Sequence, residues 1–341
     1  MSIPPLDDDA MRTAAARQAL LTKPTGSLGR LEDLSIRLAG MTGRLDPPLE
    51  RAVVFTLAAD HGVAAEGVSA YPREVTPQMV LNFLRGGAAI NVIAREVGAR
   101  VVVADMGVDA DLPAHPELRE LKIRRGTGSI TRGPAMTEAE ATRAIDAGRQ
   151  LVAGEDPDIV LTGDMGIGNT TASAALICAL TGLDPRLVVG RGTGVDDEGL
   201  RRKQAAVARA LEVNDAAIRR GPLATLAAVG GLEIAGLVGV ILQAAETRRP
   251  VIIDGFISGA AALTAAAMDG GAPGYMIASH RSHELGHAMV LERLGLQPLL
   301  DLDLRLGEGT GAALALPLIR AAVRLLNEMA TFDEAGVSDR A

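Results

Sequence analysis

The chain has 341 residues, of which 48% are hydrophobic and 22% charged, and its net charge at pH 7 is −8. This composition indicates a globular protein of about two domains, or one large α/β domain with an appendage, and excludes a disordered chain. The acidic balance argues against a nucleic-acid or anionic-membrane binder, and the single cysteine, Cys178, excludes a disulfide framework and a cysteine-rich metal site.

The two ends of the chain predict helices and no strand. Residues 10–45 contain two helical stretches, and residues 308–329 form another helix that we expect to be interrupted or kinked at Pro317. We therefore predict a small helical subdomain built from both ends, with frayed residues from about Thr331. The acidic amino terminus has no apolar segment of the kind found in signal peptides, so a cytoplasmic protein is expected.

Between the ends, short β-branched runs alternate with longer segments rich in Ala and Leu. This alternation is typical of βαβ units and predicts a mostly parallel sheet. Most of the runs are apolar throughout, as expected when helices cover both faces of the sheet. The predicted strands are Ala52–Leu57, Arg100–Ala104, Asp158–Thr162, Leu187–Val189, Pro250–Ile253 and Tyr275–Ala278.

Three helical segments between the strands have recognisable features. Thr76, followed by Pro77, is typical of a helix start and predicts a helix that runs to about Val97. Another helix is predicted from Asn169 to about Leu180. The segment 223–245 has the length of a membrane span, but Glu233 lies near its centre, so we predict one or two buried helices instead.

Polar and glycine-rich clusters follow the predicted strands. In an open parallel sheet ligands bind outside the carboxyl ends of the strands, so these clusters are expected to meet in one crevice. Their convergence predicts an enzyme or a small-molecule binder. The clusters are Asp60–Gly62, Asp105–Gly107, Gly163–Thr171, Gly190–Gly194, Asp254–Phe256 and Ser279–Glu284.

The cluster Gly163–Thr171 has the features of a phosphate site. Glycines allow a tight turn, and the helix that follows offers free N–H groups and the positive end of its dipole. The segment matches neither the P-loop nor the dinucleotide-binding pattern, and an ordinary strand-to-helix turn remains an alternative. Lys203, nine residues after Gly194, is a candidate counter-charge for a phosphate, although a lone lysine is more often a solvated helix residue.

Residues His283–His287 match the H-E-x-x-H pattern of zinc proteases. The match is short, it directly follows a predicted strand, and Gly286 weakens a helix at that point. We therefore interpret His283 and His287 as ordinary polar or capping residues and predict no metal site.

Glu308 stands between glycines in the segment Gly307–Gly311, directly before an apolar helix. Partial burial would raise the pKa of its carboxyl towards that of a useful general base. A position at the helix amino terminus would instead lower this pKa. The residues alone leave both alternatives open.

Several segments, in this order along the chain, together resemble the nicotinate-nucleotide–dimethylbenzimidazole phosphoribosyltransferase family, and the resemblance extends from about residue 20 to 325. One difference is Asp164, where many members have Glu. The segments are Lys23–Glu32, Asp60–Val63, Glu66–Ser69, Val75–Val80, Gly86–Asn91, Gly168–Thr171 and Gly307–Gly311.

The resemblance implies an enzyme of cobalamin lower-ligand assembly. Nicotinate mononucleotide and 5,6-dimethylbenzimidazole would give α-ribazole 5′-phosphate and nicotinate, without a metal or cofactor. It also implies a three-layer α/β/α fold with a mostly parallel, Rossmann-like sheet, and a homodimer with no nucleic-acid or membrane partner. The expected domains are a small helical one, residues 1–48 and 308–341, and a large α/β one, residues 49–307.

The resemblance also assigns roles to residues. Glu308 corresponds to the catalytic base, which would take a proton from one benzimidazole nitrogen as the other attacks the ribose. Ser69, Gln78, Met79 and Leu306 are expected at the benzimidazole. The nucleotide and its phosphate are expected at Asp164, Gly166, Gly168, Asn169, Thr170, Thr171, Lys203, Asp254, Gly255 and Ser282.

Three alternatives stay open at this point. A metal-dependent hydrolase built on His283, Glu284 and His287 would contain zinc and lose activity with a chelator. A non-catalytic nucleotide-binding protein of the same fold would tolerate loss of Glu308. The third alternative keeps the reaction but changes the acceptor to another base or a phenol, because acceptor choice depends on pocket shape to within a methyl group.

Overall fold

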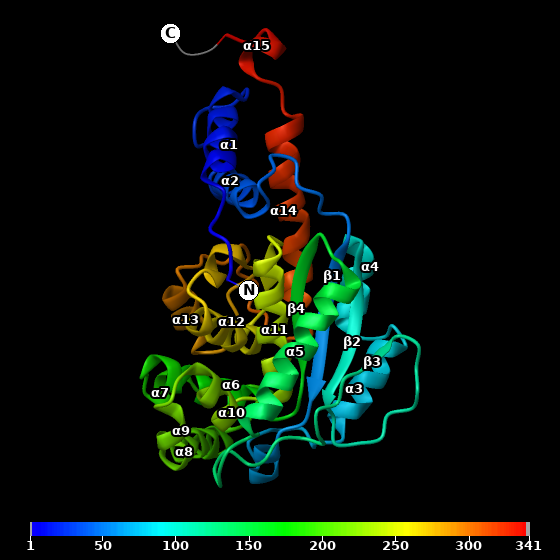
Figure 1. Ribbon diagram of the computed structural model, residues 1–341, viewed down its shortest axis with the longest axis vertical. Coiled ribbons are helices and arrows are strands. Elements are labelled where there is room, and N and C mark those ends of the chain that lie inside the picture. The colour runs from blue at the N-terminus through cyan, green and yellow to red at the C-terminus, as the bar shows by residue number, and fades with distance from the viewer. Residues whose placement is uncertain (1, 339–341) are drawn as a thin grey trace.

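The computed structural model describes residues 2–338, which form a six-stranded parallel sheet between layers of helices (Figure 1). The strand order is β3-β2-β1-β4-β5-β6, so the chain winds outward in both directions from β1. The three-layer α/β fold expected from the sequence is therefore present. The strands are β1 Ala52–Ala59, β2 Ala99–Gly107, β3 Leu118–Glu120, β4 Ile159–Met165, β5 Val251–Ile253 and β6 Met276–Ala278.

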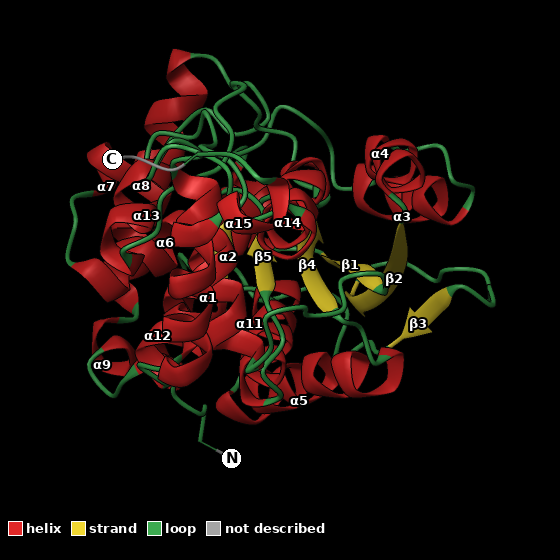
Figure 2. Ribbon diagram, turned by 90° about the horizontal axis from the view of Figure 1, so that it is seen from above, coloured by secondary structure: helices red, strands yellow, loops and turns green. Residues whose placement is uncertain are grey.

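Helices cover both faces of the sheet. Viewed from above, α5 and α11 lie on one side of the strands, and α3, α4 and α14 lie on the other (Figure 2). Every residue of β1 is buried, which explains its continuous apolar run. These helices span α3 Val75–Leu84, α4 Ala89–Val97, α5 Glu138–Glu155, α11 Leu232–Glu246 and α14 Thr310–Glu328.

The remaining helices surround these layers. The short helix α7 replaces the strand predicted at Leu187–Val189, because Asp184 caps the backbone N–H of Arg186 and Pro185 occupies the first helical position. The other five predicted strands are confirmed, while β3 was not predicted. The elements are η1 Gly62–Glu66, α6 Asn169–Thr181, α7 Pro185–Val188, α8 Asp197–Val213, α9 Asp215–Ile218, α10 Pro222–Val229, α12 Phe256–Met268, η2 Ala272–Tyr275 and α13 His287–Leu294.

The single helix predicted from Thr76 to Val97 is wrong, because the chain forms α3 and α4 there instead. Gly86 takes a left-handed conformation with φ of +75°, and Asn91 Oδ1 accepts a hydrogen bond from Ala88 N–H at the new helix start. Thr76 lies inside the first turn of α3, where its hydroxyl accepts a hydrogen bond from Ile167 N–H. The break creates a second helix amino terminus, that of α4, which packs against β2 and α14.

The apolar segment 223–245 forms two buried helices, α10 and α11, as predicted. No helix in residues 2–338 is long and apolar enough to cross a membrane. Glycines let α11 and α5 approach closely: a Cβ on Gly148 would lie 1.9 Å from the carbonyl oxygen of Gly236, and one on Gly239 1.9 Å from that of Ile145. Their backbones are thus in direct contact.

The amino-terminal helices lie away from the sheet, beside the far part of the carboxyl-terminal helix α14 (Figure 1). Helices α1 (Asp8–Leu20) and α2 (Arg30–Thr42) pack against the far part of α14, which is not interrupted at Pro317. Thr331 caps a short helix, α15 (Phe332–Ala335), so the frayed end predicted from Thr331 is wrong up to this helix. Residues 339–341 of that prediction lie outside the described residues.

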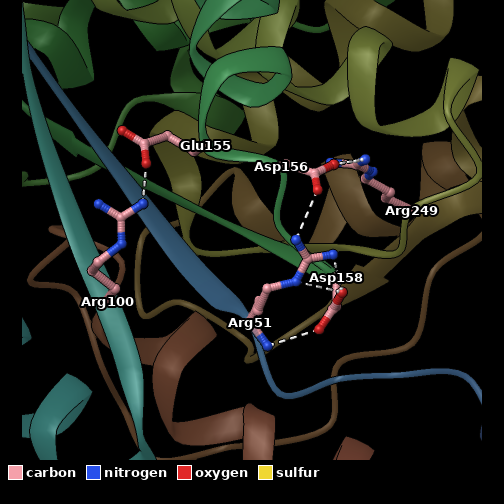
Figure 3. Close-up of polar contacts among 6 residues, drawn as sticks. All are labelled: Arg51, Arg100, Glu155, Asp156, Asp158 and Arg249. Atoms are coloured by element: carbon pink, nitrogen blue, oxygen red, sulfur yellow. Dashed lines mark hydrogen bonds and ion pairs between the residues drawn. The ribbon is translucent and has the colours of Figure 1, made fainter.

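Charged side chains gather at the amino ends of the strands (Figure 3). Arg51, just before β1, forms ion pairs of 2.7 Å with Asp156 and with Asp158. These contacts connect β1 to the end of α5 and the start of β4, at the edge of the sheet opposite the cleft described next. Arg249 pairs with Asp156, and Arg100 with Glu155.

Candidate active site

A cleft with a volume of about 280 Å³ lies outside the carboxyl ends of β4, β5 and β6. This is the edge at which the six polar clusters were expected to converge. Two of them, Asp60–Gly62 and Asp105–Gly107, do not line the cleft. The segments after these three strands contribute, together with the loop after α7 and the loop before α14. The lining residues are Tyr71, Asp164, Met165, Gly166, Ile167, Asn169, Thr170, Gly192, Thr193, Gly255, Phe256, Ile257, His280, Ser282, Glu284, Arg305, Leu306 and Gly307.

The residues predicted for the nucleotide divide into two groups. Gly168, Thr171, Lys203 and Asp254 lie behind the wall of the cleft or beside it. The other six line it: Asp164, Gly166, Asn169, Thr170, Gly255 and Ser282.

Of the residues predicted at the benzimidazole, only Leu306 lines the cleft. The hydroxyl of Ser69 is 3.2 Å from that of Thr193, a lining residue. Met79 is partly buried and Gln78 is exposed, both on α3. These three residues are therefore not part of the cleft wall.

The backbone at Glu308 is unusual. Glu308 has a φ of +65°, between Gly307 at +83° and Gly309 at +97°, so three consecutive residues are left-handed. Only glycine takes this conformation at little cost, and a non-glycine residue there often marks a functional site. The carbonyl oxygen of Glu308 accepts a hydrogen bond of 3.0 Å from the hydroxyl of Thr56, and its N–H donates one of 3.3 Å to the carbonyl of Asp164. Both sides of the loop are thus fixed to the sheet.

Glu308 is 5% exposed, and its Oε2 accepts a hydrogen bond of 3.2 Å from Ile90 N–H. Ile90 belongs to the first turn of α4, the helix created by the glycine break. Burial raises the pKa of Glu308, the Ile90 N–H opposes this, and the charge of Asp254 adds to the rise. Of the two alternatives left by the sequence, the raised pKa is therefore the one favoured.

Two more acids are buried near Glu308. Asp164 Oδ2 accepts a hydrogen bond of 3.0 Å from the side-chain amide of Asn169. Burial holds the pKa of Asp164 well above its ordinary value, and the charges of Asp254, Glu233 and Glu308 contribute. Burial likewise raises the pKa of Asp254 to about 7, against the effect of several backbone N–H groups, one of which is that of Ala312 at 3.0 Å from Oδ1.

Lys203 is a buried cation beside the cleft, not a solvated lysine. Only 1% of the residue is exposed, and its Nζ lies 3.1 Å from the hydroxyl of Thr170. Burial lowers the pKa of its ammonium to about 8, partly opposed by the charge of Glu284. A Cβ on Gly192 would lie 2.6 Å from Nζ, so Lys203, Thr170 and the backbone of Gly192 meet at one point.

The loop before α6 offers fewer free amides than expected. Ile167 N–H donates to Thr76, Asn169 N–H to the carbonyl of Gly166, and Thr171 N–H to the carbonyl of Gly168. A bound phosphate would therefore depend more on Lys203 than on these three amides.

A buried pair that the sequence analysis did not identify lies beneath this loop. His61 Nε2 and Glu233 Oε1 are 2.6 Å apart, and these residues are 1% and 0% exposed. Among residues 2–338, His61 Nδ1 and Glu233 Oε2 have no hydrogen-bond partner. The pair supports the loop from below, since a Cβ on Gly168 would lie 3.2 Å from the Cβ of His61.

The residues of the H-E-x-x-H pattern do not share a helix face. Helix α13 begins only at His287, while the side chain of His283 is 66% exposed in the preceding loop. His287 Nδ1 accepts a hydrogen bond of 2.8 Å from Ser282 N–H. In the part of the chain described, no three His, Cys, Asp or Glu residues are arranged to hold a metal ion.

Comparisons with known proteins agree on one family. A family model described as phosphoribosyltransferase matches residues 3–337. The nicotinate-nucleotide–dimethylbenzimidazole phosphoribosyltransferase of Chloroflexus aggregans is 59% identical over 341 residues, 99% of this chain and 96% of the relative. The protein of that name from Thermus thermophilus is 54% identical over 98% of this chain and 99% of the relative.

A solved structure is also closely similar. The crystal structure of CobT from Thermus thermophilus superposes with a TM-score of 0.92 at 53% identity, covering 97% of this chain and 100% of that one.

Proposed function

The chain belongs to the nicotinate-nucleotide–dimethylbenzimidazole phosphoribosyltransferase family, and from this premise we propose that Glu308 is the general base of its reaction. The activity is transfer of the 5-phosphoribosyl group from nicotinate mononucleotide to 5,6-dimethylbenzimidazole, a step of cobalamin biosynthesis. The observation that carries the role of Glu308 is its buried carboxyl, held by Ile90 N–H next to a residue that lines the cleft.

The reaction needs a base more than an acid. The pyridinium ring of the substrate already carries positive charge, so nicotinate leaves C1′ with the electrons of the broken C–N bond and needs no proton. One benzimidazole nitrogen forms the new bond to C1′ on the opposite face, which inverts the configuration. The proton on the other nitrogen passes to Glu308, so positive charge does not remain on the product ring.

The raised pKa of Glu308 suits this role. A carboxylate with a pKa closer to the working pH is a stronger base than an ordinary surface glutamate. The hydrogen bond from Ile90 N–H fixes Oε2, and no hydrogen bond from the described residues engages Oε1. We assign proton transfer to Oε1.

We propose that the 5′-phosphate binds where Lys203, Thr170 and Gly192 meet. The ammonium and the Thr170 hydroxyl are 3.1 Å apart, and an anion would restore the charge that burial disfavours on Lys203. Asp164, Gly166, Asn169, Gly255 and Ser282 would then surround the rest of the nucleotide, supported by Gly168, Thr171 and Asp254.

For the benzimidazole site we propose that Leu306 makes an apolar contact with the ring. Ser69, Gln78 and Met79 would lie around this contact, outside the cleft wall. The described part of the cleft has one lining tyrosine, Tyr71, and one lining phenylalanine, Phe256, so few aromatic rings are available to stack on the base.

We also propose that the protein is a homodimer that acts in the cytoplasm. Tyr71 and Leu306 line the cleft yet are 55% and 58% exposed, and a second copy would cover them. The proposal of a cytoplasmic protein rests on the sequence, whose single cysteine, Cys178, provides no disulfide framework. Sedimentation velocity tests the first proposal, because a species with the mass of one 35.2 kDa chain at micromolar concentration would contradict it.

The division into a helical domain, residues 1–48 and 308–341, and an α/β domain, residues 49–307, is likewise a proposal. Packing of α1 and α2 on α14 supports it. Met1 and residues 339–341 lie outside the described residues.

The function is tested by incubating the chelator-treated protein with nicotinate mononucleotide and dimethylbenzimidazole and following products by chromatography with mass detection. We expect α-ribazole 5′-phosphate and equimolar nicotinate. Nicotinate release only with another acceptor would change the substrate, and no release with any acceptor would refute the reaction.

The role of Glu308 is tested with Glu308→Gln. This change should lower kcat by about 10²- to 10⁴-fold, the usual contribution of a general base, while nicotinate mononucleotide still binds. Glu292→Gln, at an exposed position on α13, is the matched control and should leave kcat unchanged. A rate for Glu308→Gln within a few-fold of the unmodified enzyme would remove Glu308 as the base.

A further inference from the structure

His280 lies directly after β6 and lines the cleft, although only 3% of the residue is exposed. Its ring packs against the first turn of α14. A Cβ on Gly311 would lie 2.0 Å from His280 Nδ1, so the ring occupies the space that a larger residue at that position would need. The imidazole is therefore held by the backbone that follows Glu308.

The hydrogen bonds around His280 indicate which ring nitrogen carries the proton. The hydroxyl of Ser279 lies 2.7 Å from the carbonyl oxygen of Ile253 and 2.9 Å from His280 Nδ1. A carbonyl oxygen only accepts, and that of Asp254 also lies 3.2 Å from this hydroxyl, so we assign the hydroxyl proton to the carbonyls and the hydroxyl oxygen as the acceptor of Nδ1–H. Burial also lowers the pKa of His280 to about 4, so the ring is neutral near pH 7. Nε2 is then left with a lone pair.

This lone pair has no donor in the part of the protein that is described. No hydrogen bond engages Nε2 there, and a Cβ on Gly255 would lie 3.5 Å from Nε2. Gly255 itself lines the cleft. His280 itself lines the cleft, so a ligand that fills the cleft covers Nε2. A covered acceptor is costly when it stays unpaired, so the bound ligand is expected to supply a donor.

The chemistry of the two substrates limits which group this donor can be. Nicotinate mononucleotide carries a carboxylate, a phosphate and a pyridinium ring, none of which offers a reliable N–H or O–H donor near pH 7. Its ribose 2′- and 3′-hydroxyl groups are donors. Dimethylbenzimidazole has one N–H, which the proposed mechanism assigns to Glu308.

We propose that His280 Nε2 accepts a hydrogen bond from a ribose hydroxyl of nicotinate mononucleotide, and so selects ribonucleotides over deoxyribonucleotides. This inference rests on the proposed function. His280 is then a substrate-binding residue that contacts the sugar, while Lys203 contacts the phosphate and Glu308 contacts the acceptor base.

The first test uses the unmodified enzyme with the 2′-deoxy and 3′-deoxy analogues of nicotinate mononucleotide. Losing the matching hydroxyl should lower kcat/KM at least 10-fold for one of the analogues, because Nε2 then stays unpaired in the complex. Equal kcat/KM for all three nucleotides would overturn the proposal. This comparison needs no variant, so misfolding cannot obscure it.

The second test assigns the selectivity to His280. Asparagine at this position retains a donor near Nδ1 for Ser279 but has no acceptor at the place of Nε2, so His280→Asn should reduce the discrimination between ribose and deoxyribose to about threefold or less. His280→Gln, whose side-chain oxygen reaches further, should restore part of it. Unchanged discrimination in His280→Asn would overturn the proposal.

Binding measured by calorimetry separates this inference from the proposed function. If the enzyme binds the ribonucleotide more tightly than the deoxy analogue but releases no nicotinate, the reaction is refuted and the role of His280 stands. If nicotinate is released but His280→Asn lowers kcat equally for every nucleotide, the imidazole acts on the acceptor base and our inference is wrong. Absence of nucleotide binding would refute both.

Discussion

Replacing Asp254 by Asn tests how the buried acids of the site affect stability. Asp254 is 1% exposed, and its Oδ1 accepts the Ala312 N–H at 3.0 Å. Within residues 2–338, Oδ2 has no hydrogen-bond partner. Asparagine has nearly the same shape and keeps an oxygen for Ala312, but it has no charge. The comparison therefore isolates the cost of ionising this group inside the protein.

The expected size follows from the pKa of Asp254, which burial raises from 3.8 to about 7 in the folded protein. Between pH 4 and 7 the unfolded chain has released this proton while the folded chain still holds it. Stability therefore falls as pH rises through this window. The shift of about three pKa units, at 1.36 kcal/mol each, corresponds to about 4 kcal/mol.

The free energy of unfolding should be measured in urea at pH 4.5, 5.5, 6.5 and 7.5 for both proteins. Relative to the unmodified enzyme, Asp254→Asn should gain about 1.4 kcal/mol per pH unit up to pH 7 and no more above it. Asp146→Asn, at an exposed position on α5, is the control and should run parallel to the unmodified enzyme. Parallel curves for Asp254→Asn as well would refute the reasoning.

Three other substitutions give separate tests. Lys203→Met should weaken binding of nicotinate mononucleotide at least 10-fold in calorimetry. Only the unmodified enzyme should lose affinity between pH 7 and 9, because its Lys203 ammonium, with a pKa of about 8, loses its charge there. Equal affinities of the two proteins would exclude the phosphate contact. His61→Ala should lower the free energy of unfolding by about 3–5 kcal/mol, because it leaves Glu233 buried without its partner. A loss below about 1 kcal/mol in urea titrations would contradict this prediction. Gly239→Ala should lower the free energy of unfolding by about 1–3 kcal/mol, because the added methyl group forces α11 away from α5. Gly154→Ala, at a position with open space around it, should not destabilise the protein. Similar thermal melting of the two variants would refute the close approach of the helices.

The sequence predicted the sheet well because its strands are buried on both faces and therefore read as continuous apolar runs. The same reasoning failed at Leu187–Val189, where the apolar run is short. There Asp184 and Pro185 form a helix start, which favours a helix over a strand. It also missed β3, whose three residues, Leu118–Glu120, carry no such run. Gly86 shows the general limit: a glycine in a helical pattern can be tolerated or can end the helix, and tertiary packing decides which.

The candidate site was likewise predicted only in part. The convergence of the polar clusters after β4, β5 and β6 was predicted, since parallel strands bring their carboxyl ends to one edge. The clusters after β1 and β2 were expected in the same cleft, but they do not line it. The pairing of His61 with Glu233 was not predicted, because 172 residues separate them and no pattern in the sequence links the two. His280 carried a signal, its place directly after a predicted strand, but its tautomer depends on the Ser279 hydroxyl bond, which only the structure reveals.

Helix α14 connects the chemistry to the ends of the chain. It begins two residues after Glu308 and, with 19 residues, extends about 28 Å to α1 and α2 (Figure 1). The hydrogen bonds of Glu308 to Thr56 and Asp164 hold the start of this helix on the sheet, so a displacement of the terminal helices reaches the general base only if it strains these bonds. Fusion tags or truncations at either end are therefore expected to disturb catalysis where they displace α14. Their effect should appear in kcat before it appears in substrate affinity, since the loops that line the rest of the cleft are anchored to β4, β5 and β6.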